Sequence, residues 1–203
     1  MRVKICGITR LEDLRAAVAA GADALGFVFA RRSLRRLEPA NAAALVQKVP
    51  AFVSRVGLFM DQEAAEVRRI LGQVPLNLLQ FHGQEDAAFC RQFGLPYIKA
   101  LGMGSGPSLA SAEQEFADAA SLLLDSHRAG EVGGTGQTFD WAAIPALQLP
   151  LVLAGGLDPA NVREAVRRVR PWAVDVSSGV EDAPGVKNVA KMRTFISEAK
   201  SGY

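Results

Sequence analysis

The feature that most constrains this chain is a regular alternation of short apolar runs with longer segments of helical spacing. The short runs are rich in Val, Ile, Leu and Phe and are bounded by Gly, Asp or Ser. They lack the polar alternation of a half-exposed sheet, which is typical of parallel strands covered by helices. The predicted strands are Val3–Ile5, Ala24–Phe29, Ser54–Phe59, Asn77–Gln80, Tyr97–Ala100, Leu122–Leu124, Leu151–Leu153 and Ala173–Val176.

Between these strands, apolar residues recur every three or four positions, which indicates amphipathic helices. We expect Asp158 to cap the seventh helix, with Pro159 at its first position, and Gly21 to end the first helix in the left-handed conformation. Turn formers from Gly102 to Ser108 predict a short or irregular fifth helix. The predicted helices are Leu11–Ala20, Pro39–Lys48, Ala64–Leu71, Glu85–Phe93, Ala110–Ala119, Phe139–Leu147, Pro159–Arg170 and Lys187–Glu198.

The number of strand–helix units fits one closed barrel. Eight units in 203 residues leave about 25 residues for each, near the lower limit of a (β/α)8 barrel, which spans roughly 200 to over 400 residues. No linker or low-complexity segment divides the chain. The sequence therefore predicts an α/β protein with a parallel eight-stranded core, a single (β/α)8 TIM barrel domain over residues 1–203.

The charge balance and the cysteine count of the chain argue against several classes of function. The chain has 23 basic and 21 acidic residues, and a net charge of +2 is too even to predict binding to nucleic acid or to a membrane surface. We expect no secretory signal, and the longest apolar stretch, Leu149–Leu157, is about half of what spans a bilayer. Cys6 and Cys90 are too few for a metal cluster or a disulfide framework, which favours the reducing cytoplasm.

In a (β/α)8 barrel the active site lies at the carboxyl ends of the strands, so the residues that follow each strand are the functional candidates. Asp125 ends an apolar strand, where partial burial raises a carboxyl pKa and suits a general acid, although it could instead cap a backbone N–H. Cys6 could serve as a base or nucleophile if it is partly thiolate, or it could be a small core residue. Cys90 lies within a predicted helix near Phe89 and Phe93, and we expect it to pack in the core.

Glycine-containing loops follow the last two predicted strands. Gly155 and Gly156, and then Ser178 and Gly179, place backbone N–H groups where phosphate commonly docks in such barrels, beside the start of a short extra helix. The loop around Gly134 could close over the same anion. The alternative for each loop is a simple tight turn, but their joint position at adjacent strand ends favours a phosphate site.

The dense basic run Arg31–Arg36 follows the second strand. It lacks the aromatic residues of a nucleic-acid patch, whereas Arg35 could present a planar fork to a carboxylate, with the other arginines solvated. His82 could shuttle protons or contact a substrate, or it could be a structural hydrogen bonder. Asp175 could reach a sugar hydroxyl or support the turn at Ser177–Gly179.

Several motifs resemble those of one enzyme family, phosphoribosylanthranilate isomerase of tryptophan biosynthesis, in register from residue 2 to about 195. Their joint order is specific, although each alone is weak. The motifs are Lys4–Thr9, Gln80–Glu85, Leu124-Asp125 with Gly133–Gly136, Phe139–Trp141, Leu153–Leu157, Asn161-Val162 and Asp175–Glu181. The family usually has a proline where this chain has Leu34, a leucine at Phe81 and an aspartate at Asn188.

The resemblance implies an aldose–ketose isomerase that performs an Amadori rearrangement of N-(5-phosphoribosyl)anthranilate to 1-(2-carboxyphenylamino)-1-deoxyribulose 5-phosphate, without metal or cofactor. Asp125 would be the general acid at the ring oxygen and Cys6 the base at C2′. Arg35 would hold the anthranilate carboxylate, His82 and Asp175 would contact the substrate, and the glycine loops would hold its phosphate. The implied partner is a small phosphorylated molecule, with no nucleic acid or membrane, and the protein would be a monomer or homodimer.

Other readings remain open on the residues alone. A histidine-pathway ketol isomerase would have an aspartate pair, yet the first strand here ends in Cys6. Indole-3-glycerol-phosphate synthase needs lysines at strand ends, and Lys99 is the obvious candidate. A barrel that binds phosphate without catalysis is the third possibility.

Overall fold

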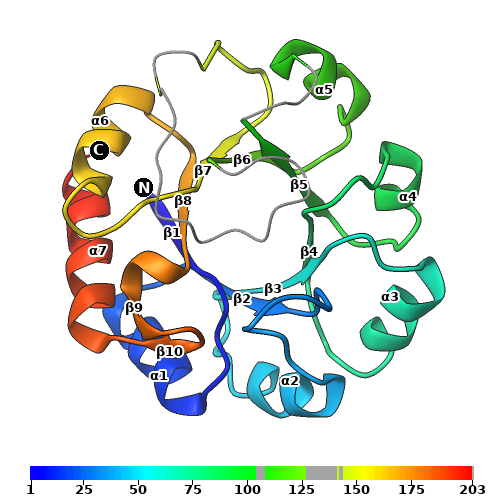
Figure 1. The fold of residues 1–203 in the computed structure, drawn as a ribbon, viewed down its shortest axis with the longest axis horizontal. Coiled ribbons are helices and arrows are strands. Elements are labelled where there is room, and N and C mark those ends of the chain that lie inside the picture. The colour runs from blue at the N-terminus through cyan, green and yellow to red at the C-terminus, as the bar shows by residue number, and fades with distance from the viewer. Residues whose placement is uncertain (104–107, 127–140, 142–143, 203) are drawn as a thin grey trace.

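A computed structural model describes residues 1–103, 108–126, 141 and 144–202. Eight strands pair in sequence order, all in parallel, and β1 pairs with β8 to close a barrel (Figure 1). The predicted fold class is therefore confirmed. The strands are β1 (Arg2–Ile5), β2 (Ala24–Val28), β3 (Ser54–Phe59), β4 (Leu78–Phe81), β5 (Tyr97–Gly102), β6 (Ser121–Asp125), β7 (Leu151–Leu153) and β8 (Ala173–Val176).

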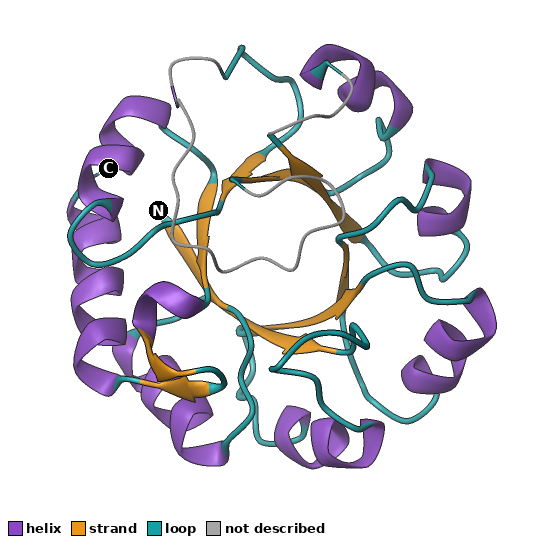
Figure 2. Cartoon of the chain, viewed as in Figure 1, coloured by secondary structure: helices purple, strands orange, loops and turns teal. Residues whose placement is uncertain are grey.

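Helices surround this barrel on the outside (Figure 2). The fifth, α5, is short, as predicted, and Gly21 ends α1 with a φ of 93°. Cys90 is fully buried in α4 and belongs to the hydrophobic core, which confirms its packing role. The helices are α1 (Leu11–Ala20), α2 (Pro39–Val46), α3 (Ala64–Leu71), α4 (Ala87–Arg91), α5 (Leu109–Glu115), α6 (Val162–Val169) and α7 (Val189–Ser201).

Some predicted helix ends are wrong. Helix α6 begins at Val162 and not at Pro159, because the Asp158 carboxylate accepts hydrogen bonds from the N–H groups of Ala160 and Asn161 and forms a turn there. The helix predicted over Phe139–Leu147 lies partly outside the described residues, and residues 144–147 are not helical. Pro145 lacks the N–H that a helix interior needs.

A hairpin after β8 was not predicted. The 3-10 helix η2 (Ser178–Val180) leads into β9 (Glu181–Ala183), which pairs antiparallel with β10 (Val186–Lys187). The helix predicted from Lys187 therefore begins only at Val189, and the Asn188 side chain caps it by accepting the Lys191 N–H at 2.9 Å. The hairpin sets charged residues beside the carboxyl end of the barrel.

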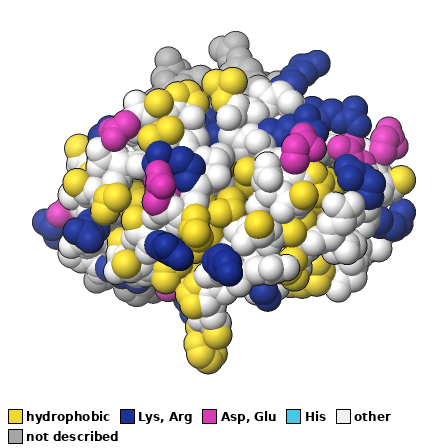
Figure 3. Space-filling view, turned by 90° about the horizontal axis from the view of Figure 1, so that it is seen from below, with side chains coloured by type: hydrophobic (Ala, Val, Ile, Leu, Met, Phe, Trp, Pro, Cys, Tyr) yellow, Lys and Arg dark blue, Asp and Glu magenta, His cyan; other side chains and the backbone are white. Residues whose placement is uncertain are grey.

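The core lies mainly between the strands and the helices. Phe29, Phe59, Phe81 and Phe93 form a chain of ring contacts with centroids 5.3–6.1 Å apart. On the surface, acidic and basic side chains are interspersed in the side view of Figure 3, in keeping with the small net charge. Among the described residues, no helix has the length and apolar character to cross a membrane.

Candidate active site

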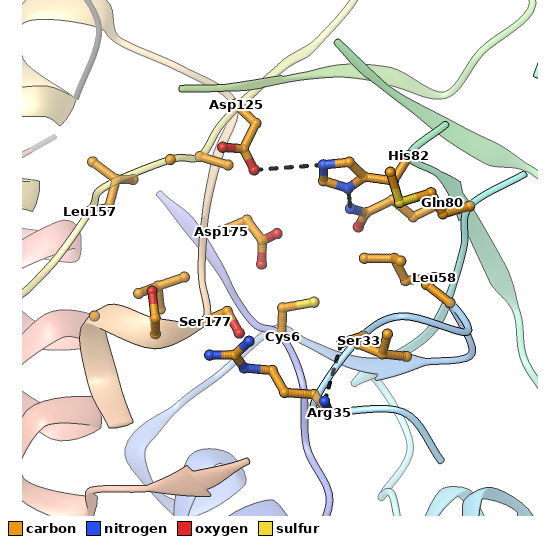
Figure 4. A pocket seen from close by; sticks show the side chains of 18 of the residues that line it. Cys6, Ser33, Arg35, Leu58, Gln80, His82, Asp125, Leu157, Asp175 and Ser177 are labelled. Carbon is orange, nitrogen blue, oxygen red and sulfur yellow. Dashed lines mark hydrogen bonds and ion pairs between the residues drawn. The ribbon is translucent and has the colours of Figure 1, made fainter. Parts of the chain in front are cut away.

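A cavity opens at the carboxyl ends of the strands and collects the predicted site residues (Figure 4). Its lining includes Cys6, Arg35, His82, Asp125, Gly155, Gly156, Asp175, Ser178 and Gly179. Gly134 lies outside the described residues. Figure 4 shows Asp125 and His82 at one end of the cavity, Cys6 and Arg35 at the other, and Asp175 between them.

Cys6 directly follows β1, and its thiol packs tightly against β2. A Cβ atom on Gly26 would lie 2.7 Å from the Cys6 Sγ, so a residue without a side chain is needed at that position. Burial raises the pKa of the Cys6 thiol, while the positive charges of Lys4 and Lys187 lower it and the charge of Asp175 raises it further. Burial outweighs the two cations, so the thiol is neutral in the free protein.

Lys4 and Asp175 form an ion pair inside the barrel, below the thiol. Lys4 precedes Cys6 by two positions and so shares its face of β1, and the register sets it opposite Asp175 on β8. The Lys4 Nζ donates to Asp175 Oδ2 at 2.8 Å, and both side chains are buried. Burial raises the pKa of Asp175 although Lys4 lowers it. Asp175 Oδ1 is buried without a hydrogen-bond partner among the described residues.

Asp125 ends β6 and faces His82, which directly follows β4. The His82 Nε2 lies 3.7 Å from Asp125 Oδ2, and both side chains are mostly buried. On the other side of the ring, the Gln80 Nε2 lies 3.0 Å from His82 Nδ1. In this orientation of the Gln80 amide, its NH2 donates to Nδ1, and a neutral ring then carries its proton on Nε2, toward Asp125.

The glycine loops pack too closely to carry side chains. Gly155 has a φ of 80°, and a Cβ atom there would lie 2.7 Å from Asp125 Oδ1. A Cβ on Gly179 would collide with the Leu157 carbonyl oxygen. The loops after β7 and β8 therefore meet in backbone contact on one wall of the cavity.

Arg35 lies on the cavity wall, but its guanidinium already binds a carboxylate of this chain. It donates through Nε to Glu181 Oε1 at 2.8 Å and through Nη2 to Glu181 Oε2 at 2.5 Å. Any carboxylate of a substrate must therefore use the remaining N–H groups of Arg35.

Sequence reasoning missed the polar partners of the predicted residues. Lys4, Gln80 and Glu181 each stand at one end of a family motif, and Lys187 at the start of a predicted helix, but no role in the site was predicted for any of them. The interpretation of Lys99 as a cavity lysine is wrong: it is buried, and its Nζ donates to the Gly83 carbonyl oxygen at 2.7 Å and to Glu85 at 3.0 Å. Lys99 is absent from the described cavity lining.

The titratable groups in this site are a thiol, an imidazole and two carboxyl groups, all of which can transfer protons. Within the described ranges, no group of three or more His, Cys, Asp or Glu residues could hold a metal ion. An eight-stranded parallel barrel that gathers a thiol and a carboxyl group at its carboxyl ends defines the class of (β/α)8-barrel enzymes.

Comparison with known proteins identifies the family within this class. The family model described as N-(5'phosphoribosyl)anthranilate (PRA) isomerase matches residues 3–198. The chain therefore belongs to the N-(5'-phosphoribosyl)anthranilate isomerase family, and it is an aldose–ketose isomerase of tryptophan biosynthesis. The resemblance found in the sequence motifs is confirmed.

Individual relatives match over nearly their whole length. N-(5'-phosphoribosyl)anthranilate isomerase of Thiobacillus denitrificans is 55% identical over 203 residues, covering 99% of this chain and 98% of the relative. A phosphoribosylanthranilate isomerase solved with reduced 1-(o-carboxyphenylamino)-1-deoxyribulose 5-phosphate has a TM-score of 0.84 and 40% identity over 99% of both chains. Monomers generated from the dimeric Thermotoga maritima enzyme have a TM-score of 0.85 and 39% identity over 98% of both chains.

Proposed function

We propose that this cavity converts N-(5-phosphoribosyl)anthranilate to 1-(2-carboxyphenylamino)-1-deoxyribulose 5-phosphate, with Asp125 as general acid and Cys6 as general base. The observation that carries the proposal is that these two side chains enter one cavity from β6 and β1, at opposite ends. An Amadori rearrangement needs one group that gives a proton to oxygen and another that removes a proton from carbon.

In the first step, protonated Asp125 donates its proton to the ring oxygen of the sugar. The bond between this oxygen and C1′ breaks, and the nitrogen lone pair forms the protonated Schiff base. His82 lies beside the Asp125 carboxylate and presents an N–H to it, so it supports the negative charge that remains after proton transfer.

In the second step, Cys6, after its thiol has lost its proton to solvent, acts as the thiolate and removes the proton from C2′. The electron pair of this C–H bond forms the C1′–C2′ double bond, and the iminium nitrogen regains its lone pair, which gives an enolamine that tautomerises to the ketone. Lys4 and Lys187 favour the thiolate through their charges. The buried Asp175 Oδ1 is placed in the cavity to accept a hydrogen bond from a sugar hydroxyl.

Two further parts of the cavity would bind the anionic groups of the substrate. Gly155, Gly156, Ser178 and Gly179 line one wall, where backbone N–H groups suit the phosphate. Arg35 lies on the wall beside Cys6 and would hold the anthranilate carboxylate. Sulfate soaked into a crystal should bind at the glycine loops, and an anion found only at residues 31–36 would contradict this assignment.

The test of the proposed function is a fluorescence assay that follows the loss of phosphoribosylanthranilate. Cys6→Ser and Asp125→Asn should each lower turnover by about 100-fold or more, because each removes a proton-transfer group. Cys90→Ala is the matched control, since this thiol lies in the core away from the cavity, and it should keep its turnover. Full activity of either site variant would refute the assignment, and a wild-type chain that binds phosphate without turnover would favour the non-catalytic barrel.

We also propose that the chain is a monomer or a homodimer, like the dimeric relative from Thermotoga maritima. The side chain of Phe52, in the segment between α2 and β3, is fully exposed, which is unusual for a phenyl ring. Sedimentation of the purified chain at several concentrations distinguishes the two states, and a higher oligomer would contradict the proposal.

A further inference from the structure

The loop that carries Arg35 does little by itself to aim this side chain. It reads Ser33-Leu34-Arg35, without a proline, and Leu34 is 76% exposed. The loop backbone is held by hydrogen bonds from the Ser33 N–H to the Ala30 carbonyl oxygen and from the Arg36 N–H to the Ser33 carbonyl oxygen, both at 3.1 Å. The Arg35 N–H donates to the Ser33 hydroxyl at 3.2 Å, and none of these bonds reaches the Arg35 side chain. A long arginine side chain loses much rotamer freedom when it is ordered, so its direction must come from contacts elsewhere.

Glu181 supplies those contacts. Both oxygens of its carboxylate accept from Arg35 in a bidentate arrangement, and the exposed fractions of the two side chains are 12% for Arg35 and 5% for Glu181. Bidentate pairing fixes the plane of the guanidinium as well as its position. The Arg35 hydrogen bonds and the charge of Lys187 lower the pKa of Glu181 even though burial raises it, so this carboxylate is ionised.

The path of the Arg35 side chain is shaped by the loop that follows Cys6. A Cβ atom on Gly7 would lie 2.5 Å from the Arg35 Cδ and 3.1 Å from the Ser177 Oγ. The aliphatic part of Arg35 therefore crosses the backbone at a residue that has no side chain. Figure 4 shows the guanidinium beside Ser177, at the same end of the cavity as Cys6.

Glu181 is itself held from the opposite side. Lys187 lies opposite it in the β9–β10 hairpin, and the Lys187 Nζ donates to Glu181 Oε1 at 2.7 Å and to the Ser177 carbonyl oxygen at 3.1 Å. The Gly185 N–H approaches the same carboxylate oxygen at 3.3 Å. Two cations thus surround one carboxylate, and the cluster of Arg35, Glu181 and Lys187 keeps a net positive charge.

We propose that Glu181 is a positioning residue that holds Arg35 ready for the carboxylate of the substrate. This inference rests on the proposed function and adds a residue to it. Glu181 binds the Nε edge of the guanidinium, and the N–H groups on the other nitrogen stay directed to a second carboxylate. Without the Glu181 charge, Arg35 and Lys187 would repel each other in a buried setting, and Arg35 would leave the cavity wall.

The test uses Glu181→Gln, which keeps the shape and removes the charge, and Arg35→Met. Binding is measured by calorimetry with reduced 1-(o-carboxyphenylamino)-1-deoxyribulose 5-phosphate and with its counterpart that lacks the carboxyl group. Glu181→Gln should weaken binding of the carboxylated compound about 10- to 100-fold and change binding of the counterpart less than about threefold. In turnover assays it should raise KM more than it lowers kcat.

Two comparisons separate positioning from a general structural role. In the Arg35→Met background, Glu181→Gln should cause less than about a twofold further loss of affinity for the carboxylated compound, because its effect passes through Arg35. Glu38→Gln is the matched control: it breaks the exposed Arg36–Glu38 ion pair in the same loop and should leave binding unchanged. If Glu181→Gln does not fold, Glu181→Asp keeps the charge with a shorter reach and should give the same selective loss.

Additive losses in the double variant, or equal losses for both compounds, would overturn the inference. Normal binding of the carboxylated compound by a folded Glu181→Gln variant would also overturn the inference. These results differ from a failure of the proposed function, in which the wild-type chain itself would show no turnover of phosphoribosylanthranilate.

Discussion

Replacing Lys4 by Met should make the stability of this protein depend strongly on pH through Asp175. The pair is buried, and Lys4 lowers the pKa of Asp175 both by its charge and by its 2.8 Å hydrogen bond. Burial already raises this pKa above its ordinary value, so the loss of Lys4 raises it further. Removing one partner of a buried pair costs about 3–5 kcal/mol when the remaining charge stays ionised.

The sign of the pH dependence follows from linkage. In the Lys4→Met variant the folded chain binds the Asp175 proton more tightly than the unfolded chain, so stability is greatest at low pH. It falls by up to about 1.4 kcal/mol per pH unit as the pH rises from about 4 to the folded-state pKa. We therefore expect the deficit relative to wild type to approach about 3–5 kcal/mol at pH 8 and to shrink markedly at pH 5.

The assay is urea unfolding followed by circular dichroism at several pH values between 5 and 8. The control is the double variant Lys4→Met with Asp175→Asn, which lacks the titrating group and should not show the added pH dependence. A Lys4→Met variant whose deficit is the same at pH 5 and pH 8 would refute the reasoning. It would mean that Asp175 does not take up a proton when it loses its partner.

Three other substitutions test single contacts. Gly26→Ala should lower turnover more than tenfold and the free energy of unfolding by about 1–3 kcal/mol, because the new Cβ would press on the Cys6 Sγ. Kinetic assays measure the first loss and urea unfolding the second. Lys99→Met should lower the free energy of unfolding in urea by about 3–5 kcal/mol, because it leaves buried Glu85 without its lysine partner. Turnover should stay within about threefold of wild type, and abolished turnover would favour a catalytic lysine. Phe52→Asn should raise stability in calorimetry by about 0.5–1 kcal/mol, since Phe52 has a φ of 68°; an unchanged or lower stability would contradict this.

The strands were the most predictable elements because barrel strands are short, mainly apolar runs bounded by turn formers. The predictions Ser54–Phe59, Leu151–Leu153 and Ala173–Val176 match the observed bounds. Helix starts were less predictable, since a side chain that can cap a helix can also form a turn before it. Asp158 illustrates this, because its carboxylate binds the N–H groups of Ala160 and Asn161, the two residues directly before α6.

In the candidate site, too, some residues could be predicted from the sequence and others could not. Residues that follow strands, such as Cys6 and His82, could be predicted because the fold alone assigns them to the cavity end of the barrel. Their partners could not, because pairing depends on register and side-chain direction. Lys4 meets Asp175 only through the closure of β1 on β8, at positions 171 residues apart in the sequence.

The charges around Cys6 give the cavity two ends of different charge. Lys4 with Asp175 is neutral as a pair, whereas Arg35, Lys187 and Glu181 together carry a net positive charge. The cavity end beside the thiol is therefore positive, and the other end holds Asp125, the proposed proton donor. A substrate with an anionic carboxylate would enter with that group toward Arg35, which sets its sugar between acid and base. In the proposed mechanism, this difference in charge would orient the substrate before either proton moves.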